Sequence, residues 1–190
     1  MEKLIEKYNQ NVAHPSDINR LLPFLHEYSK GFEHITEFGV RQAVSTYAFI
    51  MSKPKKLVGY DISRQPEIDE LEEISKESGV EFEFVLKDVL KTEIEETDVL
   101  FIDTYHVAGQ CAKELALHAS KVKHRIMFHD IAEGTYWETG EAPYEGLDHI
   151  GLDTRGLKYA IEPFMESHPE WKEIFRTQDC NGLLVLERQK

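Results

Sequence analysis

Short, largely apolar runs alternate with helical stretches between residues 34 and 130 of the chain. The apolar runs are typical of strands, and the stretches between them repeat apolar residues at helical spacing. The pattern predicts strands at residues 35–39, 56–60, 81–86, 99–102 and 125–128, and helices at 45–51, 68–78 and 108–120. Strands that alternate with helices pair in parallel through right-handed crossovers, so we expect a mostly parallel sheet with helices on both faces.

The end of the chain follows a different pattern. A helical stretch at 156–167 precedes two strand-like runs at 172–177 and 183–188. The dipeptide Asn181-Gly182 lies between these runs, and Asn-Gly is a strong hairpin signal. We therefore predict a Rossmann-like α/β fold, whose seven-stranded, mostly parallel sheet ends in an antiparallel hairpin.

The first 33 residues are expected to form helices outside the alternating pattern. Residues 3–12 read as a weak helix and 15–28 as a second one, which Pro23 bends or interrupts. We expect residues 1–33 to pack as a helical segment on the core formed by residues 34–190. A chain of 190 residues has the length of a single domain.

The charge and composition of the chain limit the classes of partner that it can bind. The net charge of −13 disfavours binding to nucleic acid or to an anionic membrane surface. No apolar run approaches the ~18 residues of a membrane-spanning helix. Cys111 and Cys180 form no disulfide framework, so we expect a cytoplasmic protein with reduced thiols. A small, neutral partner fits this surface best, and the sequence leaves a homo-oligomer open.

An acidic residue lies at or near the carboxyl end of each predicted parallel strand. These ends form one edge of the sheet, where ligands bind in such folds. Asp61 follows the second strand and lies about 20 residues beyond the first turn, the spacing of a carboxylate that accepts both hydroxyls of a ribose. Asp88 follows the third strand, where it could accept from an adenine amino group. Ordinary turn chemistry is the alternative for any one of these residues. The complete series is Glu37, Asp61, Asp88, Asp103 and Asp130.

The first strand-to-helix turn holds one glycine, Gly39, in the run Glu37-Phe38-Gly39-Val40-Arg41-Gln42-Ala43-Val44-Ser45. The G-x-G-x-x-G pattern that cradles a pyrophosphate is absent, which disfavours NAD and FAD. The turn fits a ligand without phosphates, such as S-adenosylmethionine. Arg41 and Ser45 are further candidates for contact with that cofactor, although Ser45 could instead cap the following helix.

The ends of the fourth and fifth strands carry candidate metal ligands. Asp103 and Asp130 are expected to converge because their strands are neighbours, and His129 precedes Asp130. Two carboxylates and an imidazole or a water suit Mg²⁺ or Mn²⁺, which could hold an acceptor and lower the pKa of its hydroxyl. His106 follows Asp103 by about one turn and could accept the proton. The competing interpretations are a helix cap for Asp130, a helix-start residue for His106 and a core histidine for His129.

A long segment at residues 133–153 has no clear periodicity and is typical of a lid or binding loop, with a surface insertion as the alternative. Aromatic residues near the predicted site could line an acceptor pocket or could serve packing alone. They are Tyr105, Tyr136, Trp137 and Tyr144.

The chain resembles class I methyltransferases related to macrocin O-methyltransferase and the cephalosporin hydroxylase-like proteins. The resemblance rests on the runs ITEFGVRQAVST, LVGYDIS, VLFIDTYHVAGQCAKELALH and RIMFHD. It implies Mg²⁺-assisted transfer of a methyl group from S-adenosylmethionine to a hydroxyl of a sugar or natural product. Carried over residue by residue, it implies metal ligation by Asp103 and Asp130, a general base at His106, a methionine site at Glu37 and Gly39, and a ribose site at Asp61.

The chain departs from that family at two places. Gln42-Ala43 stands where a second small residue, often glycine, is usual, and His129 stands where metal-using members have an acid. Imidazole suits Mn²⁺ or Fe²⁺ better than Mg²⁺. Two other functions therefore stay open. One is a catalytically silent binding or regulatory module on the same fold. The other is a different metal-dependent enzyme, such as a hydroxylase or hydrolase, that uses Asp103, His106, His129 and Asp130.

Overall fold

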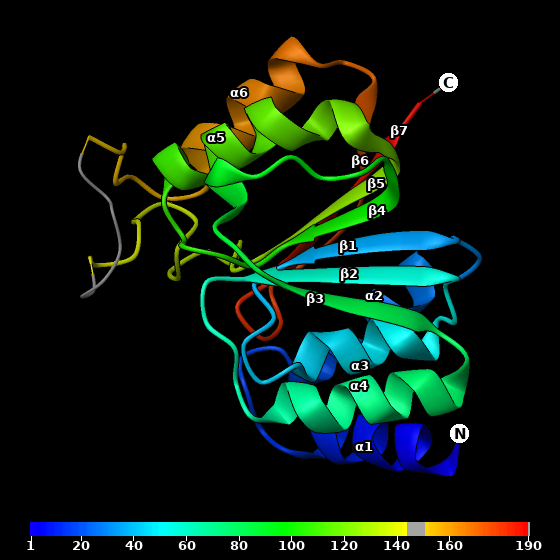
Figure 1. Ribbon diagram of the computed structural model, residues 1–190. Helices are drawn as coiled ribbons and strands as arrows, with labels where there is room; N and C mark the ends of the chain where they lie inside the picture. The colour runs from blue at the N-terminus through cyan, green and yellow to red at the C-terminus, as the bar shows by residue number, and fades with distance from the viewer. Residues whose placement is uncertain (144–150, 190) are drawn as a thin grey trace.

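The computed structural model describes residues 1–143 and 151–189, and its centre is one sheet of seven strands in the order β3-β2-β1-β4-β5-β7-β6 (Figure 1). The first five strands run parallel, and β7 is antiparallel to both β5 and β6. This confirms the predicted Rossmann-like sheet with a C-terminal antiparallel hairpin. The strands are β1 His34–Phe38, β2 Lys56–Asp61, β3 Glu81–Leu86, β4 Thr97–Ile102, β5 Val122–His129, β6 Trp171–Thr177 and β7 Leu183–Arg188.

Helices cover both faces of the sheet, as predicted. In Figure 1, α3 and α4 lie on one face with α1 beyond them, and α5 and α6 lie together on the other. Each group encloses its own cluster of buried apolar side chains against the sheet. The helices are α1 Glu2–Ala13, α2 Leu22–Ser29, α3 Val44–Met51, α4 Glu67–Ser78, α5 Ala108–His118 and α6 Lys158–Ser167, with short 3-10 turns η1 Asn19–Leu21, η2 Val89–Lys91 and η3 Ala119–Lys121.

The N-terminal helices pack on the same side of the sheet as α3. Leu4 of α1 and Leu25 of α2 are fully buried in the cluster that also holds Phe49 of α3. Pro23 interrupts the second helical stretch as predicted: a 3-10 turn ends at Leu21, and Pro23 then occupies the first turn of α2, where its missing N–H has no helical partner to lose.

Most boundaries differ from the sequence prediction by two residues or fewer, and two of the differences have a clear physical reason. Strand β5 begins at Val122, three residues early, because Lys123 and His124 are exposed members of the strand that break its apolar run. Helix α6 begins at Lys158 instead of Gly156, because the N–H of Gly156 bonds to the carbonyl of Glu138 at 3.1 Å and a Cβ at this glycine would lie 2.4 Å from the Trp137 carbonyl oxygen. Gly156 therefore belongs to the packed loop before the helix.

The order of the strands reverses between β1 and β4, which lie side by side at the centre of the sheet. Ligands of open α/β sheets bind beyond the carboxyl ends of the strands at such a reversal. Within the described residues, no helix has both the length and the apolar character that crossing a membrane requires.

Candidate functional site

A cavity of about 820 Å³ lies beyond the carboxyl ends of the central strands. Its volume is in the range of small-molecule sites. His106 lines it, and so do six of the predicted site residues at the strand ends and turns: Gly39, Arg41, Asp61, Asp88, Asp103 and Asp130. The cavity thus joins the predicted cofactor and metal positions in one space.

The turn after β1 approaches the end of β4 so closely that only glycine fits at residue 39. Gly39 has a φ of +86°, and a Cβ there would lie 1.8 Å from the carbonyl oxygen of Asp103. Arg41 and Ala43 also have positive φ values, of 45° and 63°. The turn is therefore tightly wound without a second glycine, and the left-handed residues Arg41 and Ala43 carry the conformational cost.

Asp61 braces this turn from the end of β2. Its Oδ2 accepts hydrogen bonds from the backbone N–H groups of Val40 and Arg41, both at 2.9 Å, and its Oδ1 accepts one from the N–H of Ser63 at 2.9 Å. Asp61 also lines the cavity. The sequence spacing predicts a ribose contact for this carboxylate and gives no sign of its bracing role.

Asp88 combines a cap with a cavity position. Its Oδ1 accepts from the N–H of Leu90 at 2.9 Å and so caps the 3-10 turn η2, while its Oδ2 lies 3.0 Å from the Lys91 Nζ. Val89 and Leu90 line the cavity beside it. Apolar side chains and a carboxylate therefore lie next to one another at this end of the cavity.

Glu37 and Ser45 lie beneath the turn. Both are buried, and in the described part of the chain neither lines the cavity. The Ser45 hydroxyl donates a short hydrogen bond to Glu37 Oε1, whereas Glu37 Oε2 has no partner among the described residues. Burial, with a smaller contribution from the Asp103 and Asp61 carboxylates, raises the pKa of Glu37 to about 8. The sequence predicts cofactor contacts for Glu37 and Ser45, and the structure places both side chains beneath the turn, outside the residues that line the cavity.

The buried carboxyl of Glu37 predicts a pH-dependent stability. The fold favours the neutral acid, so its contribution is fully present below the ordinary pKa of 4.5 and is lost as the pH rises towards about 8. The loss is up to roughly 1.4 kcal/mol per pH unit across this window. Glu37→Gln keeps the shape without the charge, so its free energy of unfolding, measured by urea denaturation, should exceed that of the wild type increasingly from pH 5 to pH 8.

The control for this measurement is Glu33→Gln, an exposed glutamate. Its stability curve should run parallel to that of the wild type. A Glu37→Gln curve that is also parallel to the wild type would contradict the burial of a neutral acid at this position.

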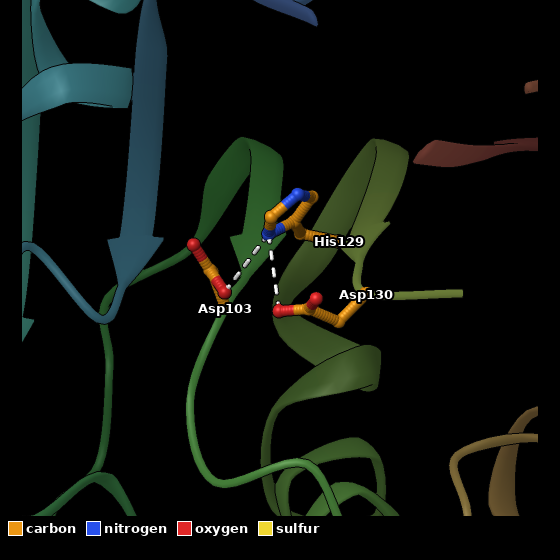
Figure 2. Close-up of side chains that lie close together, drawn as sticks. All are labelled: Asp103, His129 and Asp130. Atoms are coloured by element: carbon orange, nitrogen blue, oxygen red, sulfur yellow. Dashed lines mark hydrogen bonds and ion pairs between the residues drawn. The ribbon is translucent and has the colours of Figure 1, made fainter. Parts of the chain in front are cut away.

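Two carboxylates and two imidazoles meet at the ends of β4 and β5. Ligand atoms of Asp103, His129 and Asp130 lie within 4.8 Å of one another (Figure 2). The Nδ1 of His129 is 3.2 Å from Asp103 Oδ1 and 3.2 Å from Asp130 Oδ2. The Nε2 of His106 reaches the same two oxygens, at 3.3 Å and 2.8 Å. The convergence that the neighbouring strands predict is present, and His106 shares it.

Backbone geometry and a hairpin residue fix the Asp130 carboxylate. Asp130 has a φ of 60°, a left-handed conformation that aspartate tolerates better than most residues. The Nδ2 of Asn181, in the turn between β6 and β7, donates to Asp130 Oδ1 at 2.9 Å. The Asn-Gly turn therefore serves the site in addition to closing the hairpin, a role that the turn pattern alone does not reveal.

His106 and His129 are each held by a second contact. The Nε2 of His129 lies 2.9 Å from the Cys180 carbonyl oxygen and 3.2 Å from that of Asp17. The Nδ1 of His106 lies 3.0 Å from Glu141 Oε2, and the His106 ring stacks on Tyr136 with centroids 4.7 Å apart. Glu141 comes from the aperiodic loop, and nothing in the sequence predicts its contact with His106. Tyr136 is one of the candidate aromatic residues. Tyr144, another of them, lies outside the described residues.

The carboxylates and the imidazoles of this cluster shift one another's pKa values. Burial raises the pKa of Asp103, but the His129 charge and hydrogen bonds from His106 and His129 outweigh it and lower this pKa to about 2. Burial lowers the pKa of His106, but hydrogen bonds to Asp103, Asp130 and Glu141 outweigh it and raise this pKa well above its usual value. Without a bound cation, the three carboxylates therefore favour the protonated form of the His106 ring.

Solved methyltransferase structures share this fold. An O-methyltransferase from Bacillus cereus in complex with S-adenosylhomocysteine matches with a TM-score of 0.63 at 17% identity, over 100% of this chain and 91% of that chain. The 1,6-didemethyltoxoflavin N1-methyltransferase of Burkholderia thailandensis, with its substrate and S-adenosylhomocysteine bound, matches with a TM-score of 0.62 at 12% identity, over 100% and 87%. The magnesium protoporphyrin IX methyltransferase of Synechocystis, with bound S-adenosylmethionine, matches with a TM-score of 0.58 at 10% identity, over 91% and 78%.

No family model and no curated protein matches the sequence. The structural likeness shows the class I methyltransferase fold, which the sequence predicts.

Proposed function

We propose that the chain is an S-adenosylmethionine-dependent methyltransferase that methylates a hydroxyl of a small molecule or sugar with the help of a divalent cation. The observation that carries this proposal is the single cavity of about 820 Å³ that joins the acids after β2 and β3 to the Asp103–Asp130 pair. One side of it suits a nucleoside and the other suits a metal-held hydroxyl. The solved structures with S-adenosylmethionine or S-adenosylhomocysteine bound support this cofactor on this fold.

The cofactor half of the cavity needs no phosphate-binding loop. Asp61 would accept the ribose hydroxyls, and Asp88 would accept the adenine amino group. Gly39 and Arg41 line the wall between Asp61 and Asp103, where the methionine part would lie. Glu37 and Ser45 would act from beneath, by holding the turn in shape. A sulfonium cofactor carries no pyrophosphate, so the missing second glycine is consistent with it.

The metal half passes a test of its donor chemistry. Asp103, His129 and Asp130 offer two carboxylate oxygens and one ring nitrogen within reach of a single ion. His129 directs Nε2 at two carbonyl oxygens, which accept only, so this nitrogen carries a hydrogen, and Nδ1, on release of its own proton, would offer a lone pair to an ion. When bound, a divalent cation would supply positive charge that lowers the pKa of the acceptor hydroxyl. The protein's own part is to orient both reactants and exclude water.

The experiment that tests this function is a product assay. The protein is incubated with S-adenosylmethionine, Mn²⁺ or Mg²⁺, and a panel of catechols, flavonoids and sugars, and the mixture is analysed for S-adenosylhomocysteine and for acceptors heavier by one methyl group. We expect both products with at least one hydroxylated acceptor and neither after chelation of the metal. Cofactor binding without any product over the panel would favour a catalytically silent module instead.

The two imidazoles favour a second candidate, an iron-dependent oxygenase. Two histidines and a carboxylate form the donor set of non-haem Fe²⁺ sites. This function needs no nucleoside subsite, so Asp61 and Asp88 would keep only their structural roles, in bracing the turn after β1 and in capping η2. Consumption of 2-oxoglutarate in the presence of Fe²⁺ would support the second candidate, and its absence together with methyl transfer would exclude it.

A further inference from the structure

The ligand atoms at the ends of β4 and β5 alternate between nitrogen and oxygen. Each of two carboxylate oxygens, Asp103 Oδ1 and Asp130 Oδ2, is approached by both imidazoles, and the four separations run from 2.8 to 3.3 Å. Neighbouring ligands around one ion with bonds near 2.1 Å are spaced by about 3.0 to 3.4 Å. The ligand atoms of Asp103, His129 and Asp130 lie within 4.8 Å of one another, and Figure 2 shows these three side chains together. The Nε2 of His106 joins this group through its contacts with both carboxylate oxygens.

Each imidazole commits its other nitrogen to an acceptor. His129 Nε2 faces the Cys180 carbonyl oxygen at 2.9 Å, and His106 Nδ1 faces Glu141 Oε2 at 3.0 Å. A metal-binding histidine almost always donates its second N–H to a carbonyl or carboxylate in this way, which fixes the tautomer and the ring orientation. Both histidines show the arrangement, and both present the remaining nitrogen to the same two oxygens.

The side chains of the four candidate ligands differ in how deeply they are buried. The side chains of His129 and Asp130 are 1% and 4% exposed, whereas those of His106 and Asp103 are 15% and 14% exposed. His106, Asp103 and Asp130 also line the cavity. An ion held here would therefore be anchored on the buried side by His129 and would face the acceptor space on the other.

We propose that His106 is a fourth metal ligand and that this two-histidine, two-carboxylate centre selects a first-row transition ion, such as Mn²⁺, Fe²⁺ or Co²⁺, over Mg²⁺. The inference rests on the metal-assisted function proposed above and specifies its metal. Imidazole suits the transition ions, whereas Mg²⁺ prefers carboxylate and water oxygens. This assignment replaces the general-base role that the sequence predicts for His106.

Glu141 has a positioning role in this account. Its carboxylate fixes the His106 ring from the loop that follows β5, and Tyr136 supports the ring by stacking. Removing such an outer carboxylate typically weakens metal affinity about 10- to 100-fold without removing a ligand.

The test measures metal binding alone. Metal-stripped protein is titrated calorimetrically with Mn²⁺, Co²⁺ and Mg²⁺, and the visible absorption of the Co²⁺ form reports its ligands. We expect Mn²⁺ and Co²⁺ to bind at least about 100-fold more tightly than Mg²⁺. His106→Gln should weaken Mn²⁺ binding at least about tenfold and change the Co²⁺ spectrum, while Glu141→Gln should weaken binding with a nearly unchanged spectrum. His14→Gln, at an exposed histidine, is the matched control and should change neither.

A second variant tests the preference for transition ions over Mg²⁺ separately from the role of His106. His129→Asp restores an acid at this position and should shift the preference towards Mg²⁺. The proposal is overturned if His106→Gln binds Mn²⁺ with wild-type affinity and an unchanged Co²⁺ spectrum, or if the wild type binds Mg²⁺ as tightly as Mn²⁺.

Binding of S-adenosylhomocysteine is measured on the same samples to separate this inference from the proposed function. Cofactor binding without metal binding overturns the centre and leaves the cofactor proposal standing. Metal binding without cofactor binding overturns the cofactor proposal and leaves the metal centre standing.

Discussion

Asp130→Asn is expected to reduce methyl transfer by at least about a thousand-fold, since a metal that stabilises a developing oxyanion contributes several kcal/mol and each tenfold in rate corresponds to about 1.4 kcal/mol. Asparagine tolerates the left-handed backbone of residue 130, where φ is 60°, and it can still accept from Asn181 Nδ2. The substitution therefore removes the charge of a ligand and keeps its shape. The rate is measured with the acceptor that the product assay identifies, at saturating Mn²⁺.

The specificity of this loss is checked in two ways. The dissociation constant of S-adenosylhomocysteine should change less than about threefold, because the cofactor half of the cavity is untouched, and a change of that size is below 1 kcal/mol. Asp69→Asn, at an exposed aspartate of α4, should keep the wild-type rate. If Asp130→Asn retains more than a tenth of the wild-type rate, the metal-assisted mechanism is wrong.

Gly39→Ala is expected to have the largest effect on stability. The new Cβ would lie 1.8 Å from the Asp103 carbonyl oxygen, so β1 and β4 would have to move apart at the centre of the sheet. The left-handed backbone adds about 1–2 kcal/mol. We expect a loss of at least about 3 kcal/mol and a fall in Tm of roughly 6–12 °C, measured by thermal and urea unfolding, together with loss of cofactor binding.

Gly31→Ala is a matched control for Gly39→Ala. Gly31 has the same φ of +86°, but a Cβ there meets no described atom within 4 Å. Gly31→Ala therefore has the energetic cost of a left-handed alanine without a steric clash. Equal losses in the two variants would show that the close approach of the turn to β4 is not what requires glycine at residue 39.

The sheet and its edge could be predicted because periodicity and turn chemistry act locally. Apolar strand runs, the αL glycine Gly79 after α4 and the Asn181-Gly182 turn each leave a signal in the sequence. The convergence of Asp103 with Asp130 follows from the same logic, since neighbouring parallel strands end at one edge. The cofactor and metal roles of these residues stay predictions.

The remaining features depend on tertiary contacts that have no sequence period. Glu141 reaches His106 from a loop 35 residues away in the chain, and nothing near it in the sequence marks that contact. Glu37 is an acid at a strand end like the others, yet its side chain is buried beneath the turn because the first strand lies at the centre of the sheet. The sequence groups His106 and His129 in one candidate metal set, but the contact of both rings with the same two carboxylate oxygens depends on the tertiary fold.

The central claim, a cofactor site for S-adenosylmethionine beside a metal centre, is tested most directly by calorimetric titration of the wild-type protein with S-adenosylhomocysteine, with and without Mn²⁺. We predict micromolar binding of one molecule per chain, with NAD failing to compete. Absence of binding under both conditions would contradict it and would leave a methyltransferase fold without its ligand.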